Sequence, residues 1–393
     1  MDKRILLIAT VLTVTSCGKK DKDNPAPAKD PTVASGIATG SGTAEPAKPP
    51  SPPVGPSDPE LKKLTDAFAA CKDKNTTCAA YAPLEAYMKS SGTDDKKKKA
   101  NFDAMMACVD AGPVDRIHAC AAAASWFSGY SYEAPKDAGY GRRLLAALRT
   151  MKTDEPSYAG SKVGEFLARW LDTEDAAFRG DLAAAMVDKK LEKRGRSELF
   201  RMCEAKCVGH KELFGSALAT AQDATEAEEM RIGAMGSLTW VRDEANKKQV
   251  EQFFLAKLGD AATAPKIAMA AVSDLAQIES VDGYPKVIEV MAAHAKDQDW
   301  VPTTGLALNT YFRKPLAIDH KAGVDVALAT IKDDKVTGWY KAYAIQPLGY
   351  ANDKRVDAVL AKLATDKDGN VAKAAQEAAG IRKQAAELAK HPK

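Results

Sequence analysis

Cysteine and histidine side chains offer the most reactive chemistry in this 393-residue sequence. Cys203, Cys207 and His210 lie close together, and thiolates and imidazoles at such spacing are ligands that zinc accepts. No fourth ligand lies nearby in the sequence, so the two cysteines could instead form a disulfide or remain free thiols. We favour the disulfide and predict no metal site.

The other candidates for catalysis are five scattered histidines and several acidic pairs. The sequence contains no G-x-S-x-G elbow, H-E-x-x-H motif, Walker A loop or S-x-x-K motif. Asp94-Asp95 and Asp333-Asp334 stand where helices are expected to begin, and helix caps explain such pairs. We therefore predict no catalytic residue, no cofactor and no enzymatic activity.

Residues 126–143 concentrate aromatic side chains beside flexible and cationic residues. They hold five of the 26 aromatic residues of the chain. Rings separated by Gly and Ser, with arginines adjacent, are typical of a loop that recognises a peptide, a glycan or an aromatic ligand. The alternative is that these rings cover the junction between two helical layers. The candidate binding residues are Trp126, Tyr130, Tyr132, Tyr140, Arg142 and Arg143.

The composition indicates a chain rich in helix-forming residues. It contains 72 alanines, is 45% hydrophobic and 28% charged, and carries a formal net charge of +3. These values exclude a fibrous chain or a protein with many membrane spans. Because charges of both signs nearly cancel, we expect no nucleic-acid partner.

From residue 60 onward, Ala-rich segments alternate with short breaks. Apolar residues recur at helical spacing, as at Leu61, Leu64 and Phe68. Breaks such as Gly112-Pro113 end one helix and start the next. Strand-like alternation is nearly absent, so we predict an all-α body of sixteen to eighteen helices.

The C-terminal part of the chain resembles a known family of helical repeats. Residues 368–381 resemble the second helix of a HEAT-like repeat, whose pattern is D-x-x-V-R-x-x-A-A-x-A-L-G-x-I, with Ala372 at the usual Arg position. Residues 340–349, 31 residues earlier, fit the same pattern, and Pro347 should kink that helix. The helix at 356–363 matches the first helix of the repeat.

The resemblance implies an α-solenoid over residues 230–393, whose stacked helix pairs bury themselves against their neighbours. Residues 60–229 lack the detailed pattern, so a non-repeating helical bundle remains the alternative there. Aromatic residues near helix ends are interpreted as core of the repeats: Trp300, Tyr311, Phe312, Trp339, Tyr340 and Tyr343.

The N-terminus carries an export signal. Lys3 and Arg4 precede a short apolar run that is too short to cross a bilayer. The stretch Val14-Thr15-Ser16-Cys17 resembles the lipobox of bacterial lipoproteins, which implies cleavage of residues 1–16 and acylation of Cys17. A chance cysteine after a soluble secretory signal is the alternative. Gly18 resembles the residue that sends such proteins to the outer membrane, facing the periplasm.

The next segment, residues 17–59, is a tether between the lipidated Cys17 and the body. Its residues 18–59 hold 10 of the 20 prolines and no aromatic residue, and their lysines and acidic residues balance. Such a composition cannot bury enough apolar surface to fold, and its proline clusters favour an extended polyproline conformation. We predict a disordered spacer.

Export makes disulfides the expected state of the remaining six cysteines. Cys71 and Cys78 flank one helix break, and Cys108 and Cys120 flank another, so we expect each pair to join two helices. Cross-pairing among these four is the alternative. The helical domain at 60–229 is thus predicted to contain disulfides.

These patterns together predict a lipid-anchored helical-repeat scaffold that binds an unidentified envelope protein or peptide, without a small-molecule cofactor. Two alternatives remain open. The first is an envelope enzyme acting on cell-wall or glycan material, with the aromatic segment as substrate platform. The second is a structural spacer that assembles with other copies of itself.

Overall fold

A computed structural model describes residues 58–390 except 72–75, 91–93, 131 and 152–157. Within these residues the chain forms eighteen α-helices, two short 3-10 helices and no strand, which confirms the all-α prediction and the expected helix number. No helix in this part of the chain is long and apolar enough to span a membrane. The described residues lie in one compact unit, Ser51–Lys393. The division of the body at residues 229 and 230 stays a prediction.

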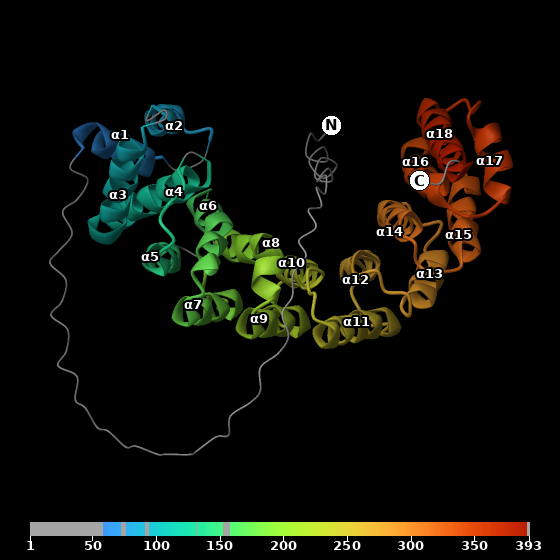
Figure 1. Cartoon of the computed structure of the whole chain (residues 1–393), viewed down its shortest axis with the longest axis horizontal. Helices are drawn as coiled ribbons and strands as arrows, with labels where there is room; N and C mark the ends of the chain where they lie inside the picture. The colour runs from blue at the N-terminus through green and yellow to red at the C-terminus, as the bar shows by residue number, and fades with distance from the viewer. Residues whose placement is uncertain (1–57, 72–75, 91–93, 131, 152–157, 391–393) are drawn as a thin grey trace, which may run out of the picture. The chain divides into compact units, whose positions relative to one another are not determined.

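The helices form two rows that alternate along the chain, which gives an α-solenoid-like fold (Figure 1). In the even-numbered row, each helix from α4 onward packs against the next even-numbered helix. This row consists of α4 (Val114–Tyr130), α6 (Tyr158–Leu167), α8 (Lys193–Val208), α10 (Glu228–Leu238), α12 (Pro265–Gln277), α14 (Val301–Arg313), α16 (Gly338–Ile345) and α18 (Gly369–Lys390).

The odd-numbered helices lie along the other side, and each packs against at least one even-numbered helix. They are α3 (Asp95–Ala111), α5 (Ala138–Arg149), α7 (Ala176–Val187), α9 (Lys211–Gln222), α11 (Glu244–Gly259), α13 (Tyr284–Ala293), α15 (His320–Lys332) and α17 (Arg355–Leu363). Two short helices, α1 (Pro59–Ala69) and α2 (Tyr81–Lys89), precede them, and α1 packs on α4. The 3-10 helices are η1 (Ala168–Thr173) and η2 (Gln346–Tyr350).

Helix ends follow the sequence signals in most places. Asp94 caps α3 by accepting hydrogen bonds from the backbone N–H groups of Lys96 and Lys97, as expected for an N-cap. Pro347 lies in η2 directly after α16, so the predicted kink is a change from α-helix to 3-10 helix. The expectation for Asp333 was wrong, because Asp333 ends α15 while Thr337 precedes α16.

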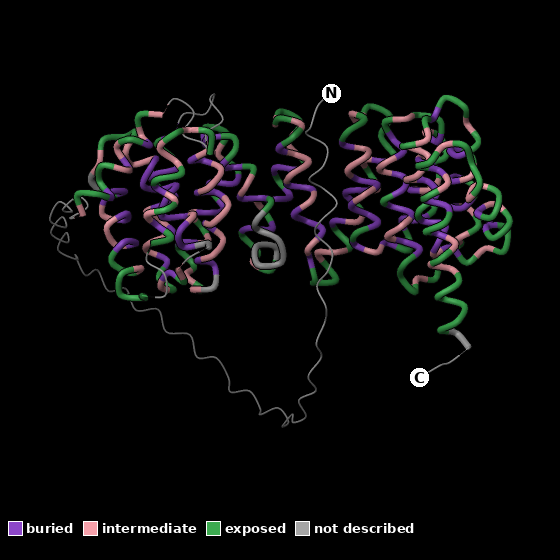
Figure 2. Tube along the Cα trace, turned by 90° about the horizontal axis from the view of Figure 1, so that it is seen from above, coloured by how far each residue is buried: buried purple, intermediate pink, exposed green. Residues whose placement is uncertain are grey.

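The even-numbered helices α10, α12, α14 and α16 repeat with a period of 37 residues. Two buried positions of the repeat show this period, because residues at equivalent positions differ by multiples of 37. Figure 2 shows that buried stretches recur in successive helices of the described chain. The first comprises Ala234, Ala271, Leu308 and Ile345, and the second comprises Ser237, Asp274, Tyr311 and Leu348. All eight residues are buried, and the six apolar ones belong to the hydrophobic core.

Glycine lets α14 and α16 approach closely. A Cβ atom added to Gly305 would lie 2.4 Å from the carbonyl oxygen of Tyr343. A Cβ atom does not come this close to a non-bonded backbone oxygen, so only Gly fits at this point of the interface. The backbone of α14 is therefore held directly against the backbone of α16.

Two cysteine pairs lie at disulfide-bonding distance. Cys71 and Cys78 have Cα atoms 6.1 Å apart, between the end of α1 and the start of α2. Cys108 of α3 and Cys120 of α4 have Cα atoms 6.0 Å apart and are completely buried. Both predicted pairings are thereby confirmed.

One core position of the repeat carries a carboxyl group. Asp274 is only 8% exposed, and one of its carboxyl oxygens has no hydrogen-bond partner. Burial raises the pKa of Asp274 well above its usual value. The folded chain therefore holds this group in its neutral form over a pH range in which the unfolded chain releases the proton.

Asp274→Asn is expected to stabilise the protein by about 1–3 kcal/mol at pH 7, because an amide carries no proton that folding must retain. The sign follows from linkage. Because the pKa of Asp274 is raised in the folded state, its contribution to stability is fully present below the unfolded pKa and is lost as the pH rises. The gain should therefore shrink toward pH 4. Urea unfolding of both chains at pH 4 and pH 7 measures it, and a gain that is equal at both values would contradict the explanation.

Candidate functional site

The aromatic segment 126–143 joins helices of the N-terminal part. The Tyr132 ring stacks on buried Phe127, with ring centroids 5.8 Å apart. The rings of Tyr132 and Tyr140 lie 5.6 Å and 5.1 Å from the ring of Phe102 on α3. These contacts connect α3, α4 and α5, in agreement with the packing alternative for this segment.

The other residues of this segment do not converge on the same surface. Arg142 forms an ion pair with Asp175 at 2.9 Å, and Arg143 donates to Asp110 and to the carbonyl oxygen of Met106. Trp126 instead lines a small cavity of about 20 Å³ together with residues of α1, α2 and α6, and the Nζ atom of Lys89 lies 5.6 Å from its ring centroid. That volume holds about one water molecule. The side chain of Tyr130 lies outside the described residues.

Three further candidates lie where the structure gives no side-chain description. Cys17 precedes the described residues. Cys203 and Cys207 lie within α8, but their side chains are outside the described part. Acylation of Cys17 and a bond between the other two therefore stay predictions.

A row of apolar side chains, partly exposed and in part packed against the hydrophobic core, crosses four consecutive even-numbered helices. At one further position of the 37-residue repeat, α10, α12, α14 and α16 carry Ile232, Met269, Leu306 and Tyr343, each the fifth or sixth residue of its helix. Leu306 is 50% exposed, and the other three are partly exposed. We call these four residues, together with Trp339 one turn before Tyr343, the apolar ladder.

Trp339 is the most exposed member of the apolar ladder, with 55% of its surface open to solvent. Its ring lies edge-on to that of Tyr343, with centroids 6.1 Å apart. The interpretation of Trp339 as core was therefore wrong, and Tyr340 and Tyr343 are only partly buried. Trp300, Tyr311 and Phe312 are buried as expected. Trp339 was missed because its aromatic type alone does not reveal which side of α16 faces the neighbouring helices.

The residues that border one side of the apolar ladder have small, uncharged side chains. One turn further along α10, α12 and α14 lie Gly236, Ser273 and Thr310, again 37 residues apart and partly exposed. A large side chain from a binding partner would meet little obstruction there, because these residues are small. The chemistry that this surface offers is apolar contact and aromatic packing rather than proton or electron transfer.

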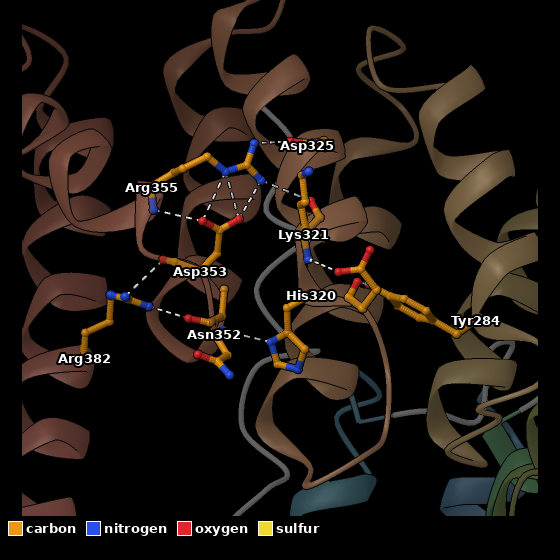
Figure 3. Close-up of polar contacts among 10 residues, drawn as sticks. Tyr284, His320, Lys321, Asp325, Asn352, Asp353, Arg355 and Arg382 are labelled. Atoms are coloured by element: carbon orange, nitrogen blue, oxygen red, sulfur yellow. Dashed lines mark hydrogen bonds and ion pairs between the residues drawn. The ribbon is translucent and has the colours of Figure 1, made fainter.

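A second group of polar residues joins the last repeats. Arg355 bonds Asp353 and, at 2.7 Å, Asp325 of α15 (Figure 3). Arg382 of α18 donates to Asp357 at 2.6 Å and to the carbonyl oxygen of Asp353 at 3.2 Å. Although Arg382 borders a pocket of about 540 Å³, its guanidinium is used in these contacts. The group fixes α17 and α18 against α15.

His320 makes this junction sensitive to pH. Its Nδ1 atom accepts a hydrogen bond from the backbone N–H of Asn352 at 2.9 Å (Figure 3). Its ring also stacks on Phe312. Burial lowers the pKa of His320 below its usual value, against a smaller opposing effect of Asp319. A lowered pKa of a base gives stability that is present above the unfolded pKa and lost as pH falls.

Lowering the pH from 7.5 to 5.5 is therefore expected to loosen the loop between η2 and α17, because a protonated Nδ1 cannot accept the bond from Asn352. Hydrogen exchange of residues 346–355, corrected for the intrinsic rate, should accelerate at pH 5.5. His320→Phe keeps an aromatic ring beside Phe312 and cannot be protonated, so its corrected exchange should not change with pH in this window. Equal corrected rates in the native chain at both values would contradict this role of His320.

Neither a protein-family model nor a curated protein sequence matches this chain. The class of protein is therefore defined by the fold and the exposed surface: an α-solenoid-like chain with an apolar ladder on its even-numbered row.

Proposed function

We propose that this protein is a lipid-anchored, HEAT-like helical-repeat scaffold of the bacterial envelope, which binds a protein or peptide through the apolar ladder. The export signal and the lipobox-like residues before Cys17 support the anchor. The outer membrane, facing the periplasm, is the proposed location. The scaffold acts by binding and carries out no catalysis.

A single observation carries the binding function: one repeat position stays apolar and partly exposed on four consecutive packed helices. Isolated exposed apolar residues are common, but a contiguous group rimmed by polar residues marks an interaction surface. Helical solenoids use such extended surfaces for binding. Trp and Tyr supply much of the binding energy in known interfaces, and the ladder ends on both.

Replacing Leu306 and Trp339 by alanine is expected to weaken partner binding by at least about 30-fold, since truncating an aromatic residue that dominates an interface costs about 2 kcal/mol or more. Both side chains are at least half exposed, so the fold should persist. Affinity capture of the tagged full chain from crosslinked envelopes, followed by mass spectrometry, measures the loss.

Leu388→Ala provides the matched control. Leu388 is 74% exposed but lies near the end of α18, outside the apolar ladder. Capture should be unchanged in this variant. A partner that the double variant and the control recover equally would exclude the apolar ladder as the binding surface.

A further inference from the structure

We infer that the occupant of the apolar ladder is an uncharged, proline-rich peptide segment in the polyproline II conformation, with one residue in every three seated on successive helices. The inference rests on the proposed binding function and specifies its ligand. It follows from the spacing, the charge and the aromatic content of the ladder.

We use the word rung for the apolar-ladder residue that each helix carries. The spacing expected between rungs on neighbouring packed helices matches one turn of polyproline II. Neighbouring packed helices lie about 8–10 Å apart, and the ladder places one apolar residue on each of four neighbours. A polyproline II helix has three residues per turn with a rise of about 3.1 Å, so equivalent side chains recur about every 9 Å. Each third residue can therefore meet one rung.

Other peptide conformations fit this arrangement less well. Side chains on one face of a strand recur at about 6.6 Å or 13 Å, so they would not coincide with side chains about 8–10 Å apart on successive helices. An α-helix returns to the same side after seven residues, about 10.5 Å, but its apolar face is wide and staggered. The ladder offers a single row, bordered on one side by Gly236, Ser273 and Thr310.

The charge of the surface selects a neutral segment. No rung carries a charge, and neither do the three small residues beside the rungs. On the other side, Lys266 of α12 forms an ion pair with Glu228 of α10, with Nζ and Oε1 3.3 Å apart. A charged side chain placed on the rungs would lose water without meeting a partner of opposite charge.

Trp339 and Tyr343 supply the surface that proline rings require. Proline-rich ligands dock on grooves lined by aromatic rings, and their preformed conformation keeps the entropy cost of binding low. The two rings lie edge-on to each other on α16, where Trp339 is 55% exposed and Tyr343 is partly exposed. Polyproline II has no internal hydrogen bonds, so its carbonyl oxygens can accept from the exposed Trp339 indole N–H.

The sequence of residues 45–56, EPAKPPSPPVGP, supplies a probe of this chemistry. It has no net charge, and Pro50, Pro53 and Pro56 lie three residues apart. The control peptide has the same composition, but its six prolines form three Pro-Pro pairs that begin five residues apart. No two prolines of the control peptide are therefore three residues apart. Fluorescence anisotropy of each labelled peptide is measured against the full chain in detergent. It is repeated with a chain whose residues 45–56 are replaced by a Gly-Ser sequence, which removes competition from the chain's own prolines.

The expected result is saturable binding of the first peptide, at least tenfold tighter than that of the control peptide. Trp339→Ala should weaken it at least tenfold, and Leu388→Ala should leave it unchanged. Equal binding of the two peptides, no binding by either chain, or tighter binding of a leucine-heptad helical peptide would overturn the inference. If envelope capture still depends on Leu306 and Trp339 while the proline peptide fails, the ligand class is wrong and the proposed function stands. If neither depends on the ladder, both fail.

Discussion

Arg196→Met is expected to lower the free energy of unfolding by about 3–5 kcal/mol, the cost of breaking a buried ion pair from one side. Arg196 and Glu226 have side chains only 4% and 8% exposed, with Nη2 and Oε2 2.7 Å apart. Arg196 also donates through Nε to the carbonyl oxygen of Met186 at 2.7 Å. Without the guanidinium, the buried Glu226 carboxylate loses its ion pair, and the carbonyl oxygen of Met186 loses the hydrogen bond from Nε.

The same pair gives a pH dependence with a defined sign. Burial is the largest single effect and raises the pKa of Glu226, but Arg196, the backbone N–H of Ala227 and the charge of Lys189 together outweigh it and keep this pKa below its usual value. A lowered acid pKa contributes stability that is present above the unfolded pKa and is lost as pH falls through the folded value. The native chain should therefore lose stability on acidification more steeply than Arg196→Met.

Urea unfolding of the two chains at pH 7 measures the effect. Arg201→Met is the matched control, because Arg201 lies on the same helix and pairs with Glu198 but is 59% exposed, so its loss should be at most about 0.5 kcal/mol. The double variant Arg196→Met with Glu226→Gln should recover part of the loss, since no buried charge remains. A loss of less than 1 kcal/mol in Arg196→Met would contradict the role of this pair.

The second large effect is expected at the Cys108–Cys120 pair. Replacing both residues by alanine should lower the free energy of unfolding by about 3 kcal/mol, because the bond closes a short loop and restricts the unfolded chain. A further loss comes from the core, since both sulfur atoms are completely buried. The pair joins α3 to α4, at the beginning of the even-numbered row.

The comparison is made by urea unfolding with and without a reducing agent. The native chain should be destabilised by reduction, and the alanine variant should respond less. The partly exposed Cys71–Cys78 pair serves as the control, since its double alanine variant adds little core loss to the loop effect. If reduction shifts both chains equally, the bond between α3 and α4 does not stabilise the fold as described.

Local features of the fold could be predicted from the sequence, because they depend on neighbouring residues. Gly112-Pro113 separates α3 from α4, and Pro347 marks the end of α16. The predicted spacing of 31 residues holds only for the last pair of even-numbered helices. The longer period of 37 residues escaped detection, because equivalent positions such as Ser237, Asp274 and Tyr311 share burial but not size, polarity or residue type.

The surface could not be predicted in the same way. Trp339 and Tyr311 are both aromatic residues near helix ends, yet one is half exposed and the other is completely buried. Which of them faces a neighbour depends on how the rows stack, and this is a property of residues far apart in the sequence. The same reason explains segment 126–143, whose rings pack on Phe102 of α3.

The most direct test of the binding function places a photo-crosslinking amino acid at position 306 of the full chain in intact cells. The same amino acid at position 388, also exposed but off the apolar ladder, is the control. The proposal predicts one dominant crosslinked partner from position 306, absent from position 388 and lost when Trp339→Ala is added. Equal products at both positions, or none at position 306, would contradict a binding surface on the even-numbered row.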